Sequence, residues 1–183
     1  MKNGSDRDVL IVDGYNVIHA WPELAGMLEN LDHARDCLVD ILAEYGAFKG
    51  WRVLVVFDAH SAVSPTTSSK TETIAGVEVA YTAEGETADS YIEKLVYQWV
   101  RQEKSVYVVT SDWIEQMVIL GSGGYRISAR ELAVDVKQVK RQLKERKEQA
   151  DRTGGRHEIG SRVNADVFAK LNRLRHGAGV PQE

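Results

Sequence analysis

The chain has 183 residues, of which 43% are hydrophobic and 27% are charged, and this composition suits one domain with a full hydrophobic core and a short appendage. No apolar stretch approaches the ~20 residues needed to cross a bilayer, and the first eight residues lack the apolar segment of a signal peptide. With a single cysteine, Cys37, and therefore no internal disulfide, we expect a cytoplasmic protein without membrane contact.

The net charge of −4 is unevenly distributed. Residues 1–136 carry 11 Lys and Arg against 21 Asp and Glu, whereas residues 137–176 carry 12 Lys and Arg against 5 Asp and Glu. An acidic body followed by a basic segment is typical of proteins that contact RNA or DNA, although a solvated basic helix has the same composition.

Short β-branched runs alternate with longer amphipathic stretches, which is the pattern of βαβ units. In chain order we predict strand 8–13, helix 32–48, strand 52–58, strand 77–82, helix 88–102, strand 105–110, helix 112–120, a weaker strand 125–128, helix 128–150 and a short helix 163–175. The strands are almost continuously hydrophobic, as in a parallel sheet covered on both faces. The fold class is therefore α/β, with a parallel sheet flanked by helices.

Helix 128–150 has the clearest predicted boundaries. Ser128 and Glu131, three residues apart, match a capping box, and Thr153-Gly154-Gly155 is expected to interrupt the helical structure.

Two segments carry no predicted helix or strand. Ser61 to Thr73 is rich in Ser, Thr and Lys and is either a substrate-contacting flap or a disordered loop. Gly121 to Gly124 follows a helix and is expected to be a turn.

Four aspartates stand where a predicted strand ends or a helix begins: Asp13, Asp58, Asp89 and Asp112. The carboxyl ends of parallel strands lie on one edge of the sheet, where ligands bind. Residues about 100 positions apart are therefore expected to share one pocket. Helix capping and turn formation explain each aspartate taken singly, and contribute roughly 0.3–1 kcal/mol apiece.

The cluster as a whole needs a further explanation, because carboxylates repel one another. Two of them about 5 Å apart repel by roughly 3 kcal/mol at an effective dielectric of about 20. Four would accumulate on the order of 10 kcal/mol, comparable to the stability of a whole domain. Such a cluster needs a cation, a proton or a basic neighbour.

Oxygen ligands favour Mg²⁺ or Mn²⁺ over Zn²⁺, and the five histidines form no zinc-binding spacing. A carboxylate-held Mg²⁺ suits phosphodiester hydrolysis. Asn16 is a candidate to orient a water or the scissile phosphate, or else it caps a turn or helix. Thr87 and Ser111 are candidates for phosphate contacts, with helix capping as the alternative. Tyr15, Trp21 and Trp113 flank this edge and either stack on RNA bases or pack in the core.

These residues carry a resemblance to a known family. Four segments, Val12-Asp13-Gly14-Tyr15-Asn16-Val17-Ile18, Val55-Val56-Phe57-Asp58-Ala59, Glu86-Thr87-Ala88-Asp89 and Val109-Thr110-Ser111-Asp112, together resemble the NYN domain of the YacP group, a branch of the PIN-like ribonucleases. The resemblance extends from Asp8 to about Arg146 and includes Ser128-Ala129-Arg130-Glu131-Leu132.

The resemblance implies a Rossmann-like sheet and an endoribonuclease that depends on Mg²⁺ or Mn²⁺. It implies a nuclease domain over residues 1–150, followed by a basic C-terminal helical extension over 151–183. Its catalytic set corresponds to Asp13, Asn16, Asp58, Asp89 and Asp112. Of these, Asp13, Asp89 and Asp112 are the expected metal ligands, whereas PIN-type sites vary at the strand that carries Asp58. It also implies mRNA as the substrate and the translating ribosome as a partner.

Two other function classes stay open. A non-catalytic RNA- or ribosome-binding module with a vestigial acidic site would bind through basic residues such as Lys137, Lys140 and Lys144, and its binding would be sensitive to salt. A phosphatase or phosphoacceptor domain would need an aspartyl nucleophile with a lysine nearby, and no lysine follows the strand edges at a suitable position. Neither cleavage specificity nor oligomeric state can be predicted.

Overall fold

The structure, a computed structural model, describes residues 8–58, 70–102 and 104–154, except for the side chains of 113–115 and 152–154. The chain divides into two compact units, Met1–Lys140 and Arg141–Glu183. The elements are β1 (Val9–Asp13), α1 (Gly14–Ala20), α2 (Pro22–Ala25), α3 (Leu31–Lys49), β2 (Arg52–Phe57), β3 (Lys70–Ile74), β4 (Val77–Tyr81), α4 (Ala88–Val100), β5 (Val106–Val109), α5 (Trp113–Gly121), β6 (Tyr125–Ile127) and α6 (Ala129–Gly154).

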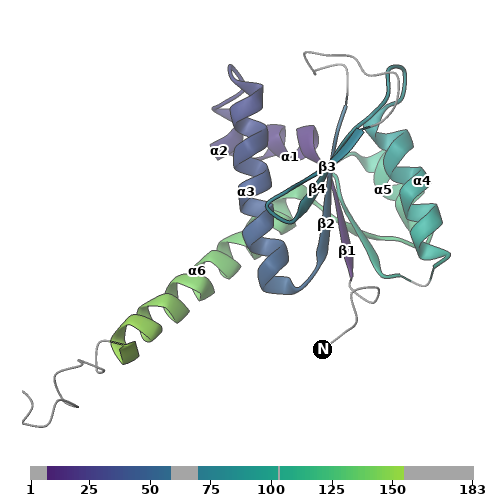
Figure 1. Cartoon of the computed structure of the whole chain (residues 1–183). Helices are drawn as coiled ribbons and strands as arrows, with labels where there is room; N and C mark the ends of the chain where they lie inside the picture. Colours follow the sequence, from purple (N-terminus) through teal and green to yellow (C-terminus); the bar gives the residue numbers. More distant parts are fainter. Residues whose placement is uncertain (1–7, 59–69, 103, 155–183) are drawn as a thin grey trace, which may run out of the picture. The chain divides into compact units, whose positions relative to one another are not determined.

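The described strands form one six-stranded sheet in the order β3-β4-β2-β1-β5-β6. All neighbours pair in parallel except β3, which pairs antiparallel with β4 at one edge. The chain moves outward from β1 to β2 and β4, and α4 then carries it across to β5 on the other side of β1 (Figure 1). This is the predicted mostly parallel α/β sheet.

Helices cover both faces of the sheet, α1 to α3 on one face and α4 with α5 on the other (Figure 1). Because successive residues of a strand point to opposite faces, each central strand contributes to two cores. Val9 and Ile11 pack towards Ile92 and Val96 of α4. Their neighbours along β1 are also fully buried, so the strand reads as one continuous hydrophobic run.

The predicted start of the last long helix is confirmed. The Ser128 amide donates to Glu131 Oε2 at 2.7 Å and the Glu131 amide donates to Ser128 Oγ at 3.2 Å, which is a complete capping box. The helix extends to Gly154, four residues beyond its predicted end. The predicted helix 163–175 lies outside the described residues. No helix in the described ranges is both long and apolar enough to span a bilayer.

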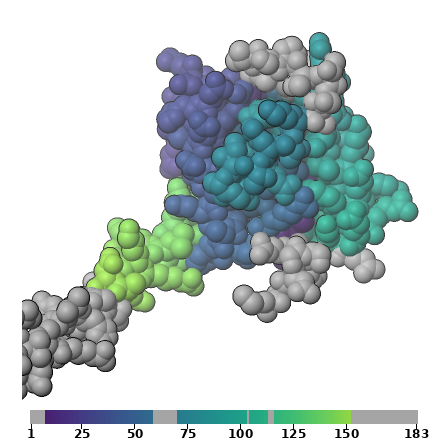
Figure 2. Space-filling model, viewed as in Figure 1, coloured from purple at the N-terminus to yellow at the C-terminus, as the bar shows by residue number. Residues whose placement is uncertain are grey.

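The prediction of a flap or a disordered loop over the segment 61–73 is partly wrong. Residues 70–73 belong to β3, which turns through Ala75 and Gly76 into β4. Side chains of β3 are mostly exposed, so no hydrophobic alternation marks this strand in the sequence. Figure 2 shows the β3–β4 hairpin at the surface between α3 and α4. The remainder of that segment lies outside the described residues.

Candidate active site

The candidate site lies at the point where the strand order reverses. β1 is hydrogen-bonded to β2 on one side and to β5 on the other, and the connections after β1 and β5 lead away in opposite directions. A crevice forms at the carboxyl ends of such strands, and ligands of α/β proteins bind there. The three strands end at Asp13, at Phe57 followed by Asp58, and at Val109 followed by Thr110, Ser111 and Asp112.

Asp13 is both the last residue of β1 and the N-cap of α1. Its Oδ1 accepts a hydrogen bond from the Asn16 amide at 3.1 Å. The turn needs glycine at the next position because a Cβ on Gly14 would lie 2.2 Å from Phe57 Cε1. The capping interpretation of Asp13 is therefore correct, and the same geometry holds its carboxylate at the sheet edge.

Burial dominates the electrostatics of Asp13. Loss of water raises the pKa of this carboxyl to about 6, and the negative charges of Asp89 and Asp58 also act to raise it, against the opposing hydrogen bonds from the Asn16 and Tyr15 amides. Residues separated by 76 positions in the sequence, Asp13 and Asp89, thus interact electrostatically. The fold thus brings Asp13, Asp58 and Asp89 close enough for their charges to interact.

Asp89 lies in the first turn of α4, beyond the end of β4. Thr87 is the N-cap of this helix, and its Oγ1 accepts from the Ser90 amide at 3.2 Å, so Thr87 does cap its helix. Partial burial raises the pKa of the Asp89 carboxyl, and the charges of Asp112 and Asp58 raise it further. Asp89 therefore interacts with Asp13, Asp58 and Asp112, and it is electrostatically the centre of the four.

Asn16 joins the two sides of the crevice. Its side-chain Oδ1 accepts a hydrogen bond from the Ser111 amide at 2.9 Å, across 95 positions in the sequence. On the β5 side, Thr110 Oγ1 accepts from the Asp112 amide at 3.1 Å, and the buried Gln116 side chain donates to the Thr110 carbonyl at 3.0 Å. The Asn16 amide oxygen thus fixes the loop that carries Asp112.

The electrostatics of this edge suit a divalent cation, although the carboxylates do not form a closed cage. In the described part of the chain, no three His, Cys, Asp or Glu side chains are grouped closely enough to form a metal site. Mg²⁺ commonly binds through one or two carboxylates and completes its shell with water and substrate phosphates, so a preformed cage is not required. A cation would relieve the repulsion that raises the pKa values of Asp13 and Asp89.

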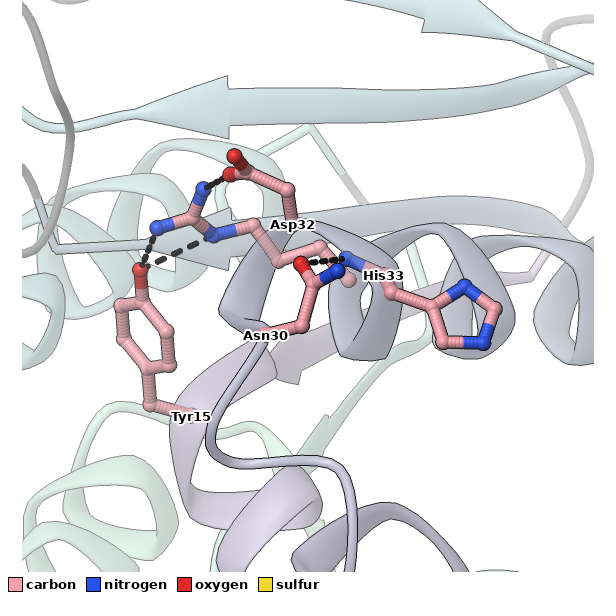
Figure 3. A network of polar contacts seen from close by, with 5 residues as sticks. Tyr15, Asn30, Asp32 and His33 are labelled. Carbon is pink, nitrogen blue, oxygen red and sulfur yellow. Dashed lines mark hydrogen bonds and ion pairs between the residues drawn. The ribbon is translucent and has the colours of Figure 1, made fainter.

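A buried arginine behind the edge is not predicted from the sequence. Arg35 of α3 is 7% exposed and donates through Nε and Nη2 to Tyr15 Oη, at 3.0 and 2.5 Å, while Nη1 pairs with Asp32 (Figure 3). Tyr15 in turn packs edge-on against Phe57, with ring centroids 5.2 Å apart. The signal in the sequence is a charged residue within the apolar stripe of α3, between Leu31 and Leu38.

The flanking aromatic residues differ in their surroundings. Trp21 is 6% exposed, and its Nε1 donates to the Ala129 carbonyl at 2.8 Å, so Trp21 is mainly a core residue. Tyr15 is half-buried and held by Arg35. The side chain of Trp113 lies outside the described set.

Comparison with known proteins places the chain in a family. The family model of the YacP-like NYN domain matches residues 10–176. The uncharacterized protein YacP of Bacillus subtilis is 44% identical over 140 residues, which are 76% of this chain and 81% of that protein.

Two crystal structures of Bacillus subtilis Rae1 (YacP) share the fold. One aligns with a TM-score of 0.70 and 38% identity, over 95% of this chain and 99% of that one. The other, of a mutant of the same protein, aligns with a TM-score of 0.69 and 39% identity, over 85% and 89% of the two chains. The fold is thus PIN-like, and the chain belongs to the YacP-like NYN domain family.

Proposed function

We propose that the protein is an endoribonuclease that depends on Mg²⁺ or Mn²⁺ and hydrolyses mRNA in association with the ribosome. The observation that carries the proposal is the mutual repulsion of four aspartates at the switch point of the sheet. Membership of the NYN family agrees with a nuclease-type domain. The ribosome and mRNA are implied by the resemblance to the YacP group.

The proposed metal ligands are Asp13, Asp89 and Asp112, with Asp58 as an additional carboxylate. When bound, the divalent cation lowers the pKa of a water nucleophile and offsets negative charge on the phosphoryl and leaving oxygens. Asp13 presents its carboxylate from a rigid strand end. Because substrate phosphates would complete the coordination shell, RNA and cation are expected to bind cooperatively.

Asn16 contributes by positioning. Its Oδ1 is used by the Ser111 amide, which leaves the Nδ2 group to donate to a water or a phosphate oxygen. This arrangement requires no nucleophilic side chain. The side chains of the site would bind and orient the scissile phosphate and balance its charge, and a water molecule would be the nucleophile.

The test compares cleavage by the unsubstituted protein and by Asp13→Asn. Each is incubated with RNA and, separately, with translating ribosomes, in Mg²⁺ or Mn²⁺ and again in EDTA. We expect the unsubstituted protein to cleave RNA in the presence of the metal, and EDTA to abolish this cleavage. The Asp13→Asn substitution should lower the cleavage rate by at least about 100-fold. Unchanged cleavage by Asp13→Asn would exclude the proposed site.

The alternative is an RNA- or ribosome-binding module without catalysis. It is favoured by the exposed basic residues of α6, among them Lys137, Lys140 and Lys144. This alternative predicts binding that weakens with salt and is unaffected by EDTA. It also predicts no scission on either substrate in any metal.

A further inference from the structure

A cavity of about 400 Å³ lies away from the acidic edge, where the end of α1 and the start of α2 face the first turns of α6. Its apolar surface includes Ala20, Trp21, Ile41 and Val136. This volume is in the range of small-molecule sites, which are mostly apolar with a few polar groups.

The floor of the cavity is rigid. Trp21 forms both the C-cap of α1 and the N-cap of α2, and its ring nitrogen is held by the buried hydrogen bond to the Ala129 carbonyl at 2.8 Å. Pro22 follows at the first position of α2. The aromatic wall is therefore fixed in place by contacts 108 residues apart in the sequence.

The rim of the cavity is basic. Arg130, Lys137 and Lys140, all on one side of α6, line it against the single carboxylate of Glu23. Lys137 Nζ lies 3.9 Å from Glu23 Oε1, and both side chains are more than 70% exposed, so this pair is weak. Three cations and one anion leave the rim with a net charge of +2 in an otherwise acidic body.

α1 connects this cavity to the acidic edge. The helix is seven residues long, about 10 Å, with the Asp13 cap at one end and Ala20 of the cavity at the other. That length corresponds to about three nucleotides of a stacked strand at ~3.4 Å per phosphate. About three nucleotides of RNA therefore span the distance from the Asp13 cap to the cavity.

We propose that the cavity binds one nucleotide of the RNA chain, at a site separate from the four aspartates, and this inference rests on the proposed function. Lys137, Lys140 and Arg130 would contact the phosphate, while the apolar floor would receive the base or ribose. RNA combines a flat apolar base with an anion at every residue, which matches this combination of wall and rim. The basic rim also offsets the repulsion between RNA and the acidic edge, because ~10 Å is close to the Debye length.

The test is RNA binding by the full chain in EDTA, where cleavage does not occur. The probe is a fluorescein-labelled single-stranded RNA of about 12 nucleotides, followed by anisotropy at several salt concentrations. We expect Lys137→Glu/Lys140→Glu to weaken binding roughly ten-fold and to reduce the slope of log affinity against log salt by about 0.7, the value for one lost phosphate contact on a single strand. Filling the floor with Ala133→Phe, which changes no charge, should weaken binding roughly five-fold.

Each variant has a matched control. Arg101→Glu/Arg126→Glu makes the same charge change at exposed positions outside the cavity and outside α6, and Val134→Phe adds the same ring at a residue that is 63% exposed. Both controls should bind RNA nearly as well as the unsubstituted protein. Equal losses in variants and controls, or no RNA binding by the unsubstituted protein, would overturn the proposed site.

A second measurement, cleavage in Mn²⁺, distinguishes failure of the proposed nucleotide site from failure of the proposed nuclease function. If the cavity variants bind weakly in EDTA while no preparation cleaves either free RNA or the mRNA of translating ribosomes, the nuclease proposal fails and the nucleotide site stands. If cleavage depends on Asp13 while the cavity variants bind as well as the controls, the site fails and the nuclease stands.

Discussion

Asp13 combines a structural role with the proposed catalytic one. Its carboxylate caps α1 through the Asn16 amide, and it is buried beside the charges of Asp89 and Asp58. A residue needed for capping alone would not have to be charged, because asparagine caps a helix as well as aspartate does. The carboxylate is therefore held at a cost to stability, as expected for a group whose charge serves function and not folding.

We predict that Asp13→Asn stabilises the fold at neutral pH in the absence of metal. The pKa of Asp13 is about 6 in the folded state, above the ordinary 3.8, so the folded protein binds the proton more tightly than the unfolded chain does. The contribution of the Asp13 carboxyl to the free energy of unfolding is fully present below about pH 4 and is lost as the pH rises through about 6. At pH 7 the variant should be more stable by about 1–3 kcal/mol, measured by urea unfolding in EDTA.

The control for this prediction is Asp40→Asn, at an exposed position of α3, which should leave stability within about 0.5 kcal/mol of the unsubstituted value. Saturating Mn²⁺ should reduce the difference in the free energy of unfolding between Asp13→Asn and the unsubstituted protein. A variant that is less stable than the unsubstituted protein at pH 7 would contradict the electrostatic argument.

Cleavage should also depend on pH through the same carboxyl. Because a cation binds the ionised form, the rate should rise between about pH 5 and about pH 7 as Asp13 loses its proton. Competition between metal and proton should move the profile to lower pH when Mn²⁺ is increased. Rates measured across this range at two Mn²⁺ concentrations would exclude this role of Asp13 if the profile were flat or moved to higher pH.

Among the single elements, the buried strands are well predicted from the sequence because their hydrophobicity is continuous. β1, β2, β4, β5 and β6 all fall within predicted ranges, shortened by one or two residues. β3 escapes prediction because it is polar and held by backbone pairing with β4. α1 and α2 escape prediction because they are short and joined at Trp21, so neither has room for a clear helical period.

The junction between β1 and α1 depends on close packing at Gly14. We predict that Gly14→Ala destabilises the fold by about 1–3 kcal/mol, because the new methyl group would lie 2.2 Å from Phe57 Cε1. Cleavage should fall as well, since the shift displaces Asp13. Gly121→Ala is the control: nothing lies within 4 Å of its added Cβ, and it should change stability little. Equal urea midpoints for the two variants would refute the packing argument.

Arg35 connects α3 to the start of α1 through Tyr15. We predict that Arg35→Met and Tyr15→Phe each lower stability, and that the double variant loses less than the sum by about 1 kcal/mol or more, because the two side chains share hydrogen bonds. Arg35→Lys should recover only part of the loss, since lysine lacks the planar fork. If the losses in the free energy of unfolding, measured with urea, were strictly additive, the Arg35–Tyr15 contact would contribute nothing to stability.

In the molecule as a whole, the candidate site is a consequence of topology. Asp13 and Asp112 are distant in sequence, yet the pairing of β1 with β5 brings the two strand ends together. This convergence is predictable from the sequence because strand ends can be located by pattern. The Asn16–Ser111 hydrogen bond and the buried Arg35 are not predictable, since both depend on how side chains pack between elements.

The cavity on α6 could not be predicted for the same reason. Arg130, Lys137 and Lys140 read as part of a basic helix in the sequence, and the apolar floor beneath them comes largely from α1, α2 and α3. An acidic edge and a basic rim separated by one short helix give the body two regions of opposite charge. The proposed substrate would use both regions.

Whether the acidic edge holds a divalent cation decides the proposed chemistry. A crystal of the full chain soaked in Mn²⁺ and examined for anomalous scattering answers this question. We expect a Mn²⁺ peak about 2.1 Å from carboxylate oxygens of Asp13 and Asp89, lost in crystals of Asp13→Asn. A fully soaked crystal with Mn²⁺ bound elsewhere and no peak between these two carboxylates would rule the metal site out.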